Sequence, residues 1–145
     1  MFRKLTIDDL DYIDENLLPI NKEEVKILTG KTFKEFCLGN ESFMEASEVW
    51  EKDGKIITIF GGLPVEGELN IWLLCTKNIL NYKDKFKVWT YKRLMREKKN
   101  YDIITSMVYM KNYLTKKWLK RLGFEIGRPQ PIGRNGELFC RFEMR

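Results

Sequence analysis

The spacing of hydrophobic and polar residues along the chain predicts short strands alternating with helices. Runs rich in β-branched and aromatic residues are typical of strands, and apolar residues at intervals of three and four are typical of helices. The predicted strands cover residues 2–5, 43–51, 55–60, 69–76, 102–110, a segment that begins at Phe124, and residues 137–144. The predicted helices cover residues 7–17, 21–30, 82–98 and a basic segment after Asn112, with a further helical turn or two at residues 32–38.

Capping and turn residues mark the limits of these elements. Thr6 and Asp9 fit a capping box for the first helix, and Asn21 is a suitable cap for the second. Residues that favour turns or interrupt strands then separate the remaining elements. They are Asp53-Gly54, the run Gly61-Gly62-Leu63-Pro64, the loop residues Pro129, Pro131 and Gly133, and the hairpin tip Asn135-Gly136.

Residues 107–125 carry the clearest signals for a strand, a short helix and a second strand. Asn112 suits the turn after the strand and can cap the helix that follows. Gly123 stands where helices commonly end in the left-handed conformation. Leu114, Trp118 and Leu122 recur at every fourth position, so we expect them to form one face, with Lys116, Lys117, Lys120 and Arg121 on the other sides.

The order of the predicted elements favours an α/β fold in a single domain. A chain of 145 residues is long enough to bury roughly two-thirds of its unfolded surface without disulfides or metals. Hairpin strands are followed by strands that are separated by helices, so the sheet is expected to be mixed. We predict a mixed central sheet of six to seven strands flanked by about four helices, formed by residues 1–145 together.

The chain contains no histidine and three cysteines. Without histidine, no Ser-His or Cys-His nucleophile pair can form and no histidine can bind zinc, so we expect no metal site. The cysteines lack Cys-x-x-Cys spacing and are expected to be reduced thiols. Proton transfer, if any occurs, falls to carboxylates, tyrosines, cysteines, lysines or water.

Charge is distributed unevenly along the chain. Residues 1–72 hold 8 Lys and Arg against 15 Asp and Glu, whereas residues 73–145 hold 18 against 6. This asymmetry indicates either an anionic partner for the C-terminal half or attraction between the two halves. Basic residues also interleave with Trp89, Tyr91 and Trp118, which makes nucleic-acid binding a hypothesis, although their helical spacing favours core packing. No apolar run reaches the ~18 residues of a membrane span.

Residues 112–124 resemble the fourth-helix segment of the GCN5-related N-acetyltransferases (GNATs), in which an Asn precedes a helix that ends in Gly-Phe. The opening residues 2–6 and 8–10 are similar to the first strand and helix of that superfamily. More narrowly, residues 71–76, 86–99, 103–109 and 119–124 resemble, in their order, a family of small phage proteins with this fold, which includes an internal virion protein of short-tailed coliphages. The narrower resemblance implies a protein that either stays in the host cytoplasm or is packaged from it into the virion.

The resemblance implies acetyl-CoA as the cofactor. In the enzymes, acyl-CoA lies where the fourth and fifth strands separate, and a glycine-rich loop after the fourth strand holds its pyrophosphate. Here residues 75–83 contain no glycine, and lysines crowd the same place, either to hold phosphates or as a solvated helix face. Backbone N–H groups at the separated strand end are expected to be free to polarise a thioester carbonyl. The residues implied to bind the cofactor are Leu74, Cys75, Thr76, Lys83, Lys85 and Asn112, the last of which also fits a plain helix cap.

Direct acyl transfer requires an acid for the leaving thiolate and a base for the amine. In the resembling enzymes the acid is a Tyr seven residues after the Asn, and Leu119 stands at that position here. The candidates for the acid are therefore Tyr109 and Cys75, with Tyr113 as a further possibility. The candidate for the base is Glu68, with Glu66 as a further possibility, and both are alternatively plain surface carboxylates in a loop.

The family resemblance leaves two kinds of function open. One is a degenerate acyltransferase-like domain that binds a host or virion protein in virion assembly or genome delivery. The other is an active N-acetyltransferase that takes a CoA thioester as its partner and moves an acetyl group to an amine. Nucleic-acid binding by the basic helices is a third hypothesis, and would be salt-sensitive and unspecific.

Overall fold

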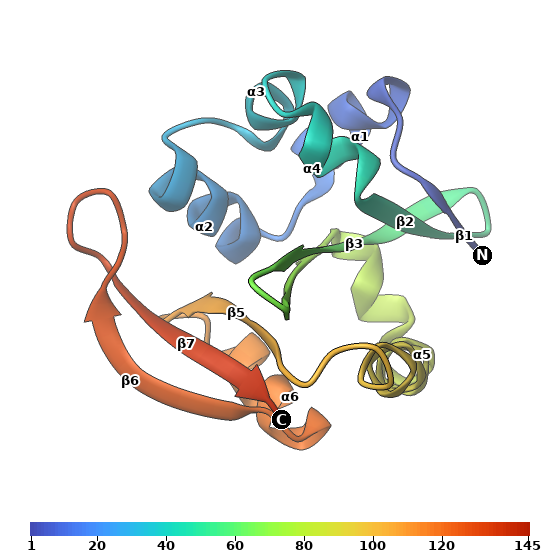
Figure 1. Ribbon diagram of the computed structural model, residues 1–145. Helices are drawn as coiled ribbons and strands as arrows, with labels where there is room; N and C mark the ends of the chain where they lie inside the picture. The colour runs from blue at the N-terminus through green and yellow to red at the C-terminus, as the bar shows by residue number, and fades with distance from the viewer. The chain divides into compact units, whose positions relative to one another are not determined.

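The computed structural model describes all of residues 1–145 and contains a seven-stranded mixed sheet in the order β1-β2-β3-β4-β5-β7-β6 (Figure 1). The strands are β1 (Phe2–Lys4), β2 (Ser47–Lys52), β3 (Lys55–Val65), β4 (Glu68–Cys75), β5 (Ile104–Tyr109), β6 (Glu125–Pro131) and β7 (Leu138–Met144). The helices are α1 (Leu10–Asn16), α2 (Pro19–Thr29), α3 (Phe33–Leu38), α4 (Glu41–Glu45), α5 (Lys83–Glu97) and α6 (Tyr113–Leu122), with 3₁₀ turns at Ile7–Asp9 and Lys77–Asn81. The predicted α/β class and mixed sheet are confirmed, with six α-helices where about four were expected.

The chain forms two compact units, each assembled from two stretches of sequence. The first unit comprises Met1–Gly62 and Trp72–Phe86, and the second comprises Leu63–Ile71 and Lys87–Arg145. β3, β4 and α5 contribute residues to both. None of the helices combines the length and the apolar character that a membrane crossing requires. The assignment of residues 1–145 to one domain stays a prediction.

In the first unit, β1, β2 and β3 pair antiparallel. Helices α1 and α3 and strands β2 and β3 share one hydrophobic cluster, in which Ile13, Phe33 and Ile59 are almost fully buried. Burial of each such side chain contributes about 1.5–3 kcal/mol to folding. The end of β4 joins the same cluster through Leu74, so the strand that carries several predicted site residues is fixed by the core of this unit.

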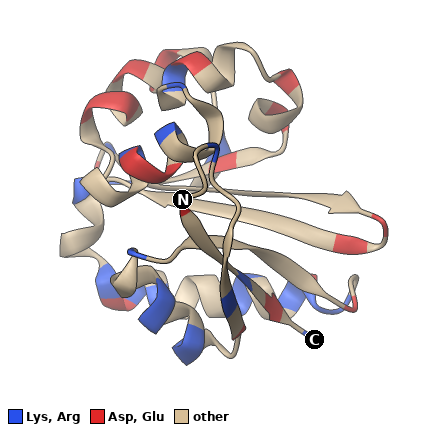
Figure 2. Cartoon of the chain, turned by 90° about the vertical axis from the view of Figure 1, so that its left-hand side faces the viewer, with Lys and Arg blue, Asp and Glu red and all other residues tan.

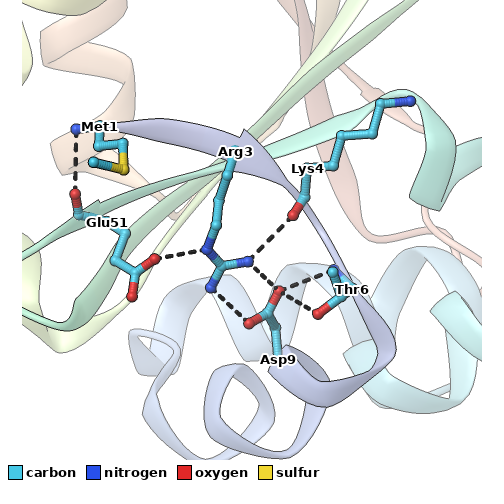
Figure 3. Close-up of polar contacts among 6 residues, drawn as sticks. All are labelled: Met1, Arg3, Lys4, Thr6, Asp9 and Glu51. Atoms are coloured by element: carbon cyan, nitrogen blue, oxygen red, sulfur yellow. Dashed lines mark hydrogen bonds and ion pairs between the residues drawn. The ribbon is translucent and has the colours of Figure 1, made fainter.

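An ion-pair network ties the first strand to the first helical turn (Figure 3). The Arg3 guanidinium donates to both carboxylate oxygens of Asp9 at 2.8 Å and to the Glu51 carboxylate at 2.6 Å. The Thr6 backbone N–H donates to Asp9 Oδ2 at 2.9 Å, so the predicted pairing of Thr6 with Asp9 is confirmed. Arg3 thereby connects β1 with β2 and with the 3₁₀ turn that leads into α1.

In the second unit, β7 pairs antiparallel with both β5 and β6. The predicted sequence of strand, Asn cap, helix and left-handed glycine is confirmed for residues 104–123. Asn112 accepts a hydrogen bond from the Thr115 backbone N–H at 3.2 Å, and Gly123 has a φ of 101°. Phe124 then packs edge-on against Phe142 with ring centroids 5.0 Å apart, which anchors the start of β6 on the sheet.

The glycine-proline run at residues 61–64 does not end a strand, as the sequence had indicated, but lies inside β3. A Cβ atom on Gly61 would lie 2.5 Å from the Ala46 carbonyl oxygen and 2.5 Å from the Trp72 ring. Gly61 is therefore required by close packing and not by a turn. The strand reverses later, where Glu66 and Gly67 both have positive φ angles, of 52° and 82°.

Two further strand predictions were wrong at their limits. Phe43 was expected in a strand but lies in α4, and β2 begins only at Ser47. Pro129 and Pro131 were expected in a loop but belong to β6. β6 is the edge strand of the sheet, so a proline without an N–H need not interrupt a ladder on its outer side.

The buried face of α6 also differs from the prediction. Leu114 is 64 % exposed, whereas Leu119 and Leu122 are buried at 4 % and 8 % exposure. The predicted face is therefore confirmed at Leu122 and wrong at Leu114, and it also includes Leu119. Lys117, Lys120 and Arg121 are exposed as expected.

Candidate functional site

The end of β4 is covered by the junction between α1 and α2. The Cys75 backbone N–H donates to the Asn21 side-chain oxygen at 2.9 Å, and the Leu18 backbone N–H donates to the Cys75 carbonyl at 2.9 Å. The resemblance implied a free N–H at this position, and that expectation is wrong for Cys75. Its backbone groups already have partners from within the chain.

Leu74, the residue before Cys75, also offers no N–H to a ligand on the side of β4 to which the Cys75 N–H points. Consecutive residues of a strand direct their backbone groups to opposite sides. The Thr76 N–H donates to the Ile57 carbonyl of β3 at 3.0 Å. The backbone N–H and carbonyl of Cys75 therefore point away from β3, and those of Leu74 point towards it. The Leu74 side chain is 8 % exposed and belongs to the hydrophobic cluster of the first unit.

The segment after β4 is a 3₁₀ turn instead of a glycine-rich loop. The Thr76 hydroxyl donates to the Ile56 carbonyl at 2.7 Å and accepts from the Asn78 backbone N–H at 3.3 Å. The Asn78 side chain donates both to the Ile56 carbonyl and to the Tyr12 hydroxyl, each at 2.8 Å. These bonds attach the turn to β3 and α1, and Thr76 acts as a cap for the turn.

The predicted phosphate-binding lysines lie at the start of α5. Lys83 and Lys85 are both exposed. Contact with the Lys85 ammonium lowers the pKa of Lys52 on β2. Nearby, the Tyr82 hydroxyl donates to the Asp53 carboxylate at 2.6 Å, which raises the pKa of Tyr82. The lysines thus form a solvent-exposed cationic group without a backbone cradle contributed by glycine.

Asn112 is 2 % exposed and acts as the N-cap of α6. Its side-chain oxygen accepts from the Thr115 backbone N–H. In the same unit, parallel pairing of β4 with β5 covers only Leu69 with Ile104 and Asn70 with Thr105, and does not continue to Ile71. The strand–helix junction that carries Asn112 has therefore formed as predicted, while its contact with a cofactor stays a prediction.

The three catalytic candidates have different surroundings. Tyr109 is 5 % exposed, with its ring 5.2 Å from that of Phe139. Glu68 forms an ion pair with Arg141 at 3.0 Å. Burial raises the pKa of the Cys75 thiol to about 12, with a smaller contribution from the charge of Glu24. Glu68 and Tyr109 belong to the second unit and Cys75 to the first.

The roles of Leu18 and Asn21 do not follow from the pattern of the sequence. Asn21 was interpreted as a helix cap, but α2 begins at Pro19 and its N-cap is Leu18. Proline is favoured at the first helical position, so Pro19 was the available signal. It moves the helix start two residues earlier and leaves the Asn21 side chain inside the first turn, free to contact β4.

The residues at the end of β4 do not fit acetyl-CoA in the way that the resemblance implies. The Cys75 N–H is occupied, the following turn is held to β3, and no glycine lies between residues 75 and 83. The structure also brings together no group of three or more Cys, Asp and Glu side chains that could hold a metal ion.

Comparison with solved structures shows similarity across the whole chain. Ard1 from Thermoplasma volcanium has a TM-score of 0.73 at 14 % identity, with 99 % of this chain and 95 % of that chain covered. A GNAT-family acetyltransferase from Bacillus anthracis has a TM-score of 0.70 at 13 % identity, covering 99 % and 92 %. The ribosomal-protein-alanine N-acetyltransferase from Brucella melitensis has a TM-score of 0.66 at 13 % identity, covering 99 % and 98 %.

Sequence comparison adds no relative. No protein-family model matches the chain, and no curated protein matches it. At these identities the structural similarity describes the fold. The chain has the fold of the GNAT acetyltransferases.

Proposed function

We propose that this chain is an acyltransferase-like GNAT domain that acts by binding a partner and does not transfer an acyl group. The observation that carries the proposal is the state of the three candidate proton-transfer groups. Glu68 is paired with Arg141, Tyr109 is buried beside Phe139, and the Cys75 thiol has a pKa of about 12.

Each of these states opposes general acid–base catalysis. A base paired with a guanidinium must lose that pairing before it can accept a proton from an amine. An acid works best when its pKa lies near the working pH, and a thiol with a pKa of about 12 is far above it. Leu119, at the position of the family's acid, is a buried hydrocarbon side chain.

The partner that we favour is a protein with an acidic surface, and its contact is the exposed face of α6. This helix holds four Lys and Arg and no acidic residue, whereas residues 7–45 hold ten Asp and Glu and four Lys (Figure 2). Tyr113 and Leu114 are 68 % and 64 % exposed at its start. The exposed aromatic and aliphatic side chains beside cations are suited to a protein interface. The sequence resemblance suggests a phage virion or host protein.

A second candidate function is active N-acetyltransfer. It is favoured by the short parallel ladder between β4 and β5, which covers two residue pairs only, and by the similarity of 99 % of the chain to solved structures of acetyltransferases. For this function Glu68 would act as the base and acetyl-CoA as the acyl donor.

Release of CoA thiol separates the two functions. Purified protein is mixed with acetyl-CoA and a panel of amines, including an N-terminal alanine peptide and spermidine, and thiol is followed by absorbance after reaction with a disulfide reagent. We expect no release above the rate without protein. Amine-dependent release that is lost in Glu68→Gln but kept in Glu66→Gln would overturn the proposal and establish the acetyltransferase.

Binding through α6 is tested with an acidic protein surface as the ligand. Biolayer interferometry with phage virion proteins immobilised on the sensor should show binding that falls in the double variant Lys117→Glu with Arg121→Glu. Binding should be kept in the double variant Lys55→Glu with Lys77→Glu, which makes the same charge change elsewhere on the surface. Equal retardation of duplex DNA at low salt by all variants would count against the protein interface and favour unspecific nucleic-acid binding.

A further inference from the structure

The α1–α2 junction runs along the end of β4 as a short extra strand. Leu17 forms an antiparallel bridge with Thr76, and both are fully buried. The next two contacts belong to Cys75, whose carbonyl accepts from the Leu18 N–H and whose N–H donates to the Asn21 side chain, both at 2.9 Å. Leu17, Leu18 and Asn21 of the junction and its helix thus contact one strand end.

These contacts lie on the side of β4 that faces away from β3. Thr76 bonds to Ile57 of β3, and backbone direction alternates along a strand, so the Cys75 groups point to the opposite side. A strand, or a ligand that carries amides, would pair with β4 through this same N–H and carbonyl.

The junction provides one donor and one acceptor, as a peptide or ligand amide would. Leu17 and Leu18 are both extended, with ψ angles of 145° and 141°, because α1 ends before them and Pro19 starts α2 after them. The Leu18 carbonyl is already engaged inside the helix, because it accepts from the Asn21 backbone N–H at 2.9 Å. The Asn21 side chain, which is 5 % exposed, therefore supplies the oxygen that accepts from the Cys75 N–H.

We infer that Leu18 and Asn21 are a built-in replacement for an amide ligand at the edge of β4, so that acyl-CoA cannot pair with Cys75 while the junction is in place. The inference deepens the proposed function and rests on it, because it names what holds the strand edge of a domain that works without the cofactor. The Asn21 oxygen accepts the hydrogen bond that a thioester or pantetheine carbonyl would otherwise accept. Asn21 is a positioning residue in this assignment.

The bond can be observed directly in the unaltered protein. In a uniformly ¹⁵N- and ¹³C-labelled sample, a scalar coupling across the hydrogen bond should connect the Cys75 backbone nitrogen with the Asn21 side-chain carbonyl carbon. The Cys75 amide should exchange with solvent slowly. Addition of pantetheine, which carries amides and no phosphate, or of acetyl-CoA should change neither signal. Loss of the coupling when either compound is added would overturn the inference.

Variants test whether Asn21 is responsible for the slow exchange of the Cys75 amide. We expect Asn21→Ala to raise the exchange rate of the Cys75 amide by about tenfold or more, because an acceptor is removed. Asn21→Asp keeps an oxygen acceptor and should retain slow exchange. Asn16→Ala, whose side chain bonds only to the Tyr12 carbonyl one turn earlier in α1, should leave Cys75 unchanged. Unchanged Cys75 exchange in Asn21→Ala would refute the inference, and if that variant does not fold, the coupling experiment alone decides.

The outcome of these experiments is separable from the proposed function. If acetyl-CoA binds and amine-dependent thiol release occurs while the coupling persists, the proposed function fails and the inference about Asn21 stands. If the coupling is absent and no thiol is released, the inference fails and the proposed function stands.

Discussion

The guanidinium of Arg3 forms two parallel hydrogen bonds with the carboxylate of Asp9, each 2.8 Å long. Asp9 is 8 % exposed, and Arg3 donates in addition to Glu51. Removal of the cation would leave a nearly buried carboxylate with only the Thr6 donors. The pair therefore fixes the first strand against the turn before α1.

We expect Arg3→Ala to lower the free energy of unfolding by about 2 kcal/mol, since breaking a partly buried pair leaves one charge uncompensated. Arg3 itself is about one-third exposed, which reduces the cost below that of a fully buried pair. Urea unfolding followed by tryptophan fluorescence measures the difference. Lys34→Ala, which removes an exposed ion pair with Asp11, is the control and should lower the free energy of unfolding far less. Equal effects of the two changes would contradict this account.

The same pair predicts how stability depends on pH. Burial alone would raise the pKa of Asp9, but the hydrogen bonds from Arg3 and Thr6 outweigh it and lower the pKa below its ordinary value. A carboxyl whose pKa is lower in the folded state stabilises fully above its unfolded pKa, and that contribution is lost as pH falls through the folded value. The stability difference between the natural protein and Asp9→Asn should thus be constant from pH 7 to about pH 5 and shrink below about pH 4. A constant difference down to pH 2 would show that Asp9 does not titrate as described.

Gly61→Ala should be strongly destabilising. The added methyl would lie 2.5 Å from both the Ala46 carbonyl oxygen and the Trp72 ring, and overpacking of this kind costs about 1–3 kcal/mol. Gly39→Ala is the matched control, because its new methyl would meet neighbours only at 3.8 Å or more. Thermal unfolding of the two variants should give a clearly lower Tm for Gly61→Ala alone.

Asn112→Ala should lower the free energy of unfolding by about 1 kcal/mol through loss of the N-cap of α6. Asn112→Ser keeps an oxygen that can accept from the Thr115 N–H and should recover most of the loss. Urea unfolding of the three proteins provides the comparison. If serine and alanine were equally destabilising, the amide would have a role other than capping.

Cys37 and Cys75 should react slowly with thiol reagents. Burial raises the pKa of each thiol to about 12, so that at pH 8 only about one molecule in 10⁴ carries the thiolate that reacts. A disulfide reagent added to the folded protein should therefore modify Cys75 far more slowly than after unfolding in urea, where the pKa returns to about 8.5. Mass spectrometry of digested samples identifies the labelled residue. Rapid labelling of Cys75 in the folded protein would contradict the raised pKa of its thiol.

Where the signals are local, the sequence predicted the structure well. The Thr6–Asp9 pairing, the Asp53–Gly54 turn, the Asn112 cap and the Gly123 helix end depend on residues within four positions of each other, and all four formed. The order of strands and helices also sufficed for the α/β class. These features follow from backbone preferences and from the apolar pattern, both of which are written in neighbouring residues.

Tertiary structure decided the features that depend on distant residues. Gly61 looked like a strand breaker because nothing near it in sequence reveals the Trp72 ring that needs its space. Asn21 looked like a cap because its partner, the Cys75 N–H, lies 54 residues away. A side chain that can serve its own helix or a distant strand is ambiguous in sequence, and only the fold shows which backbone group is close enough to bond.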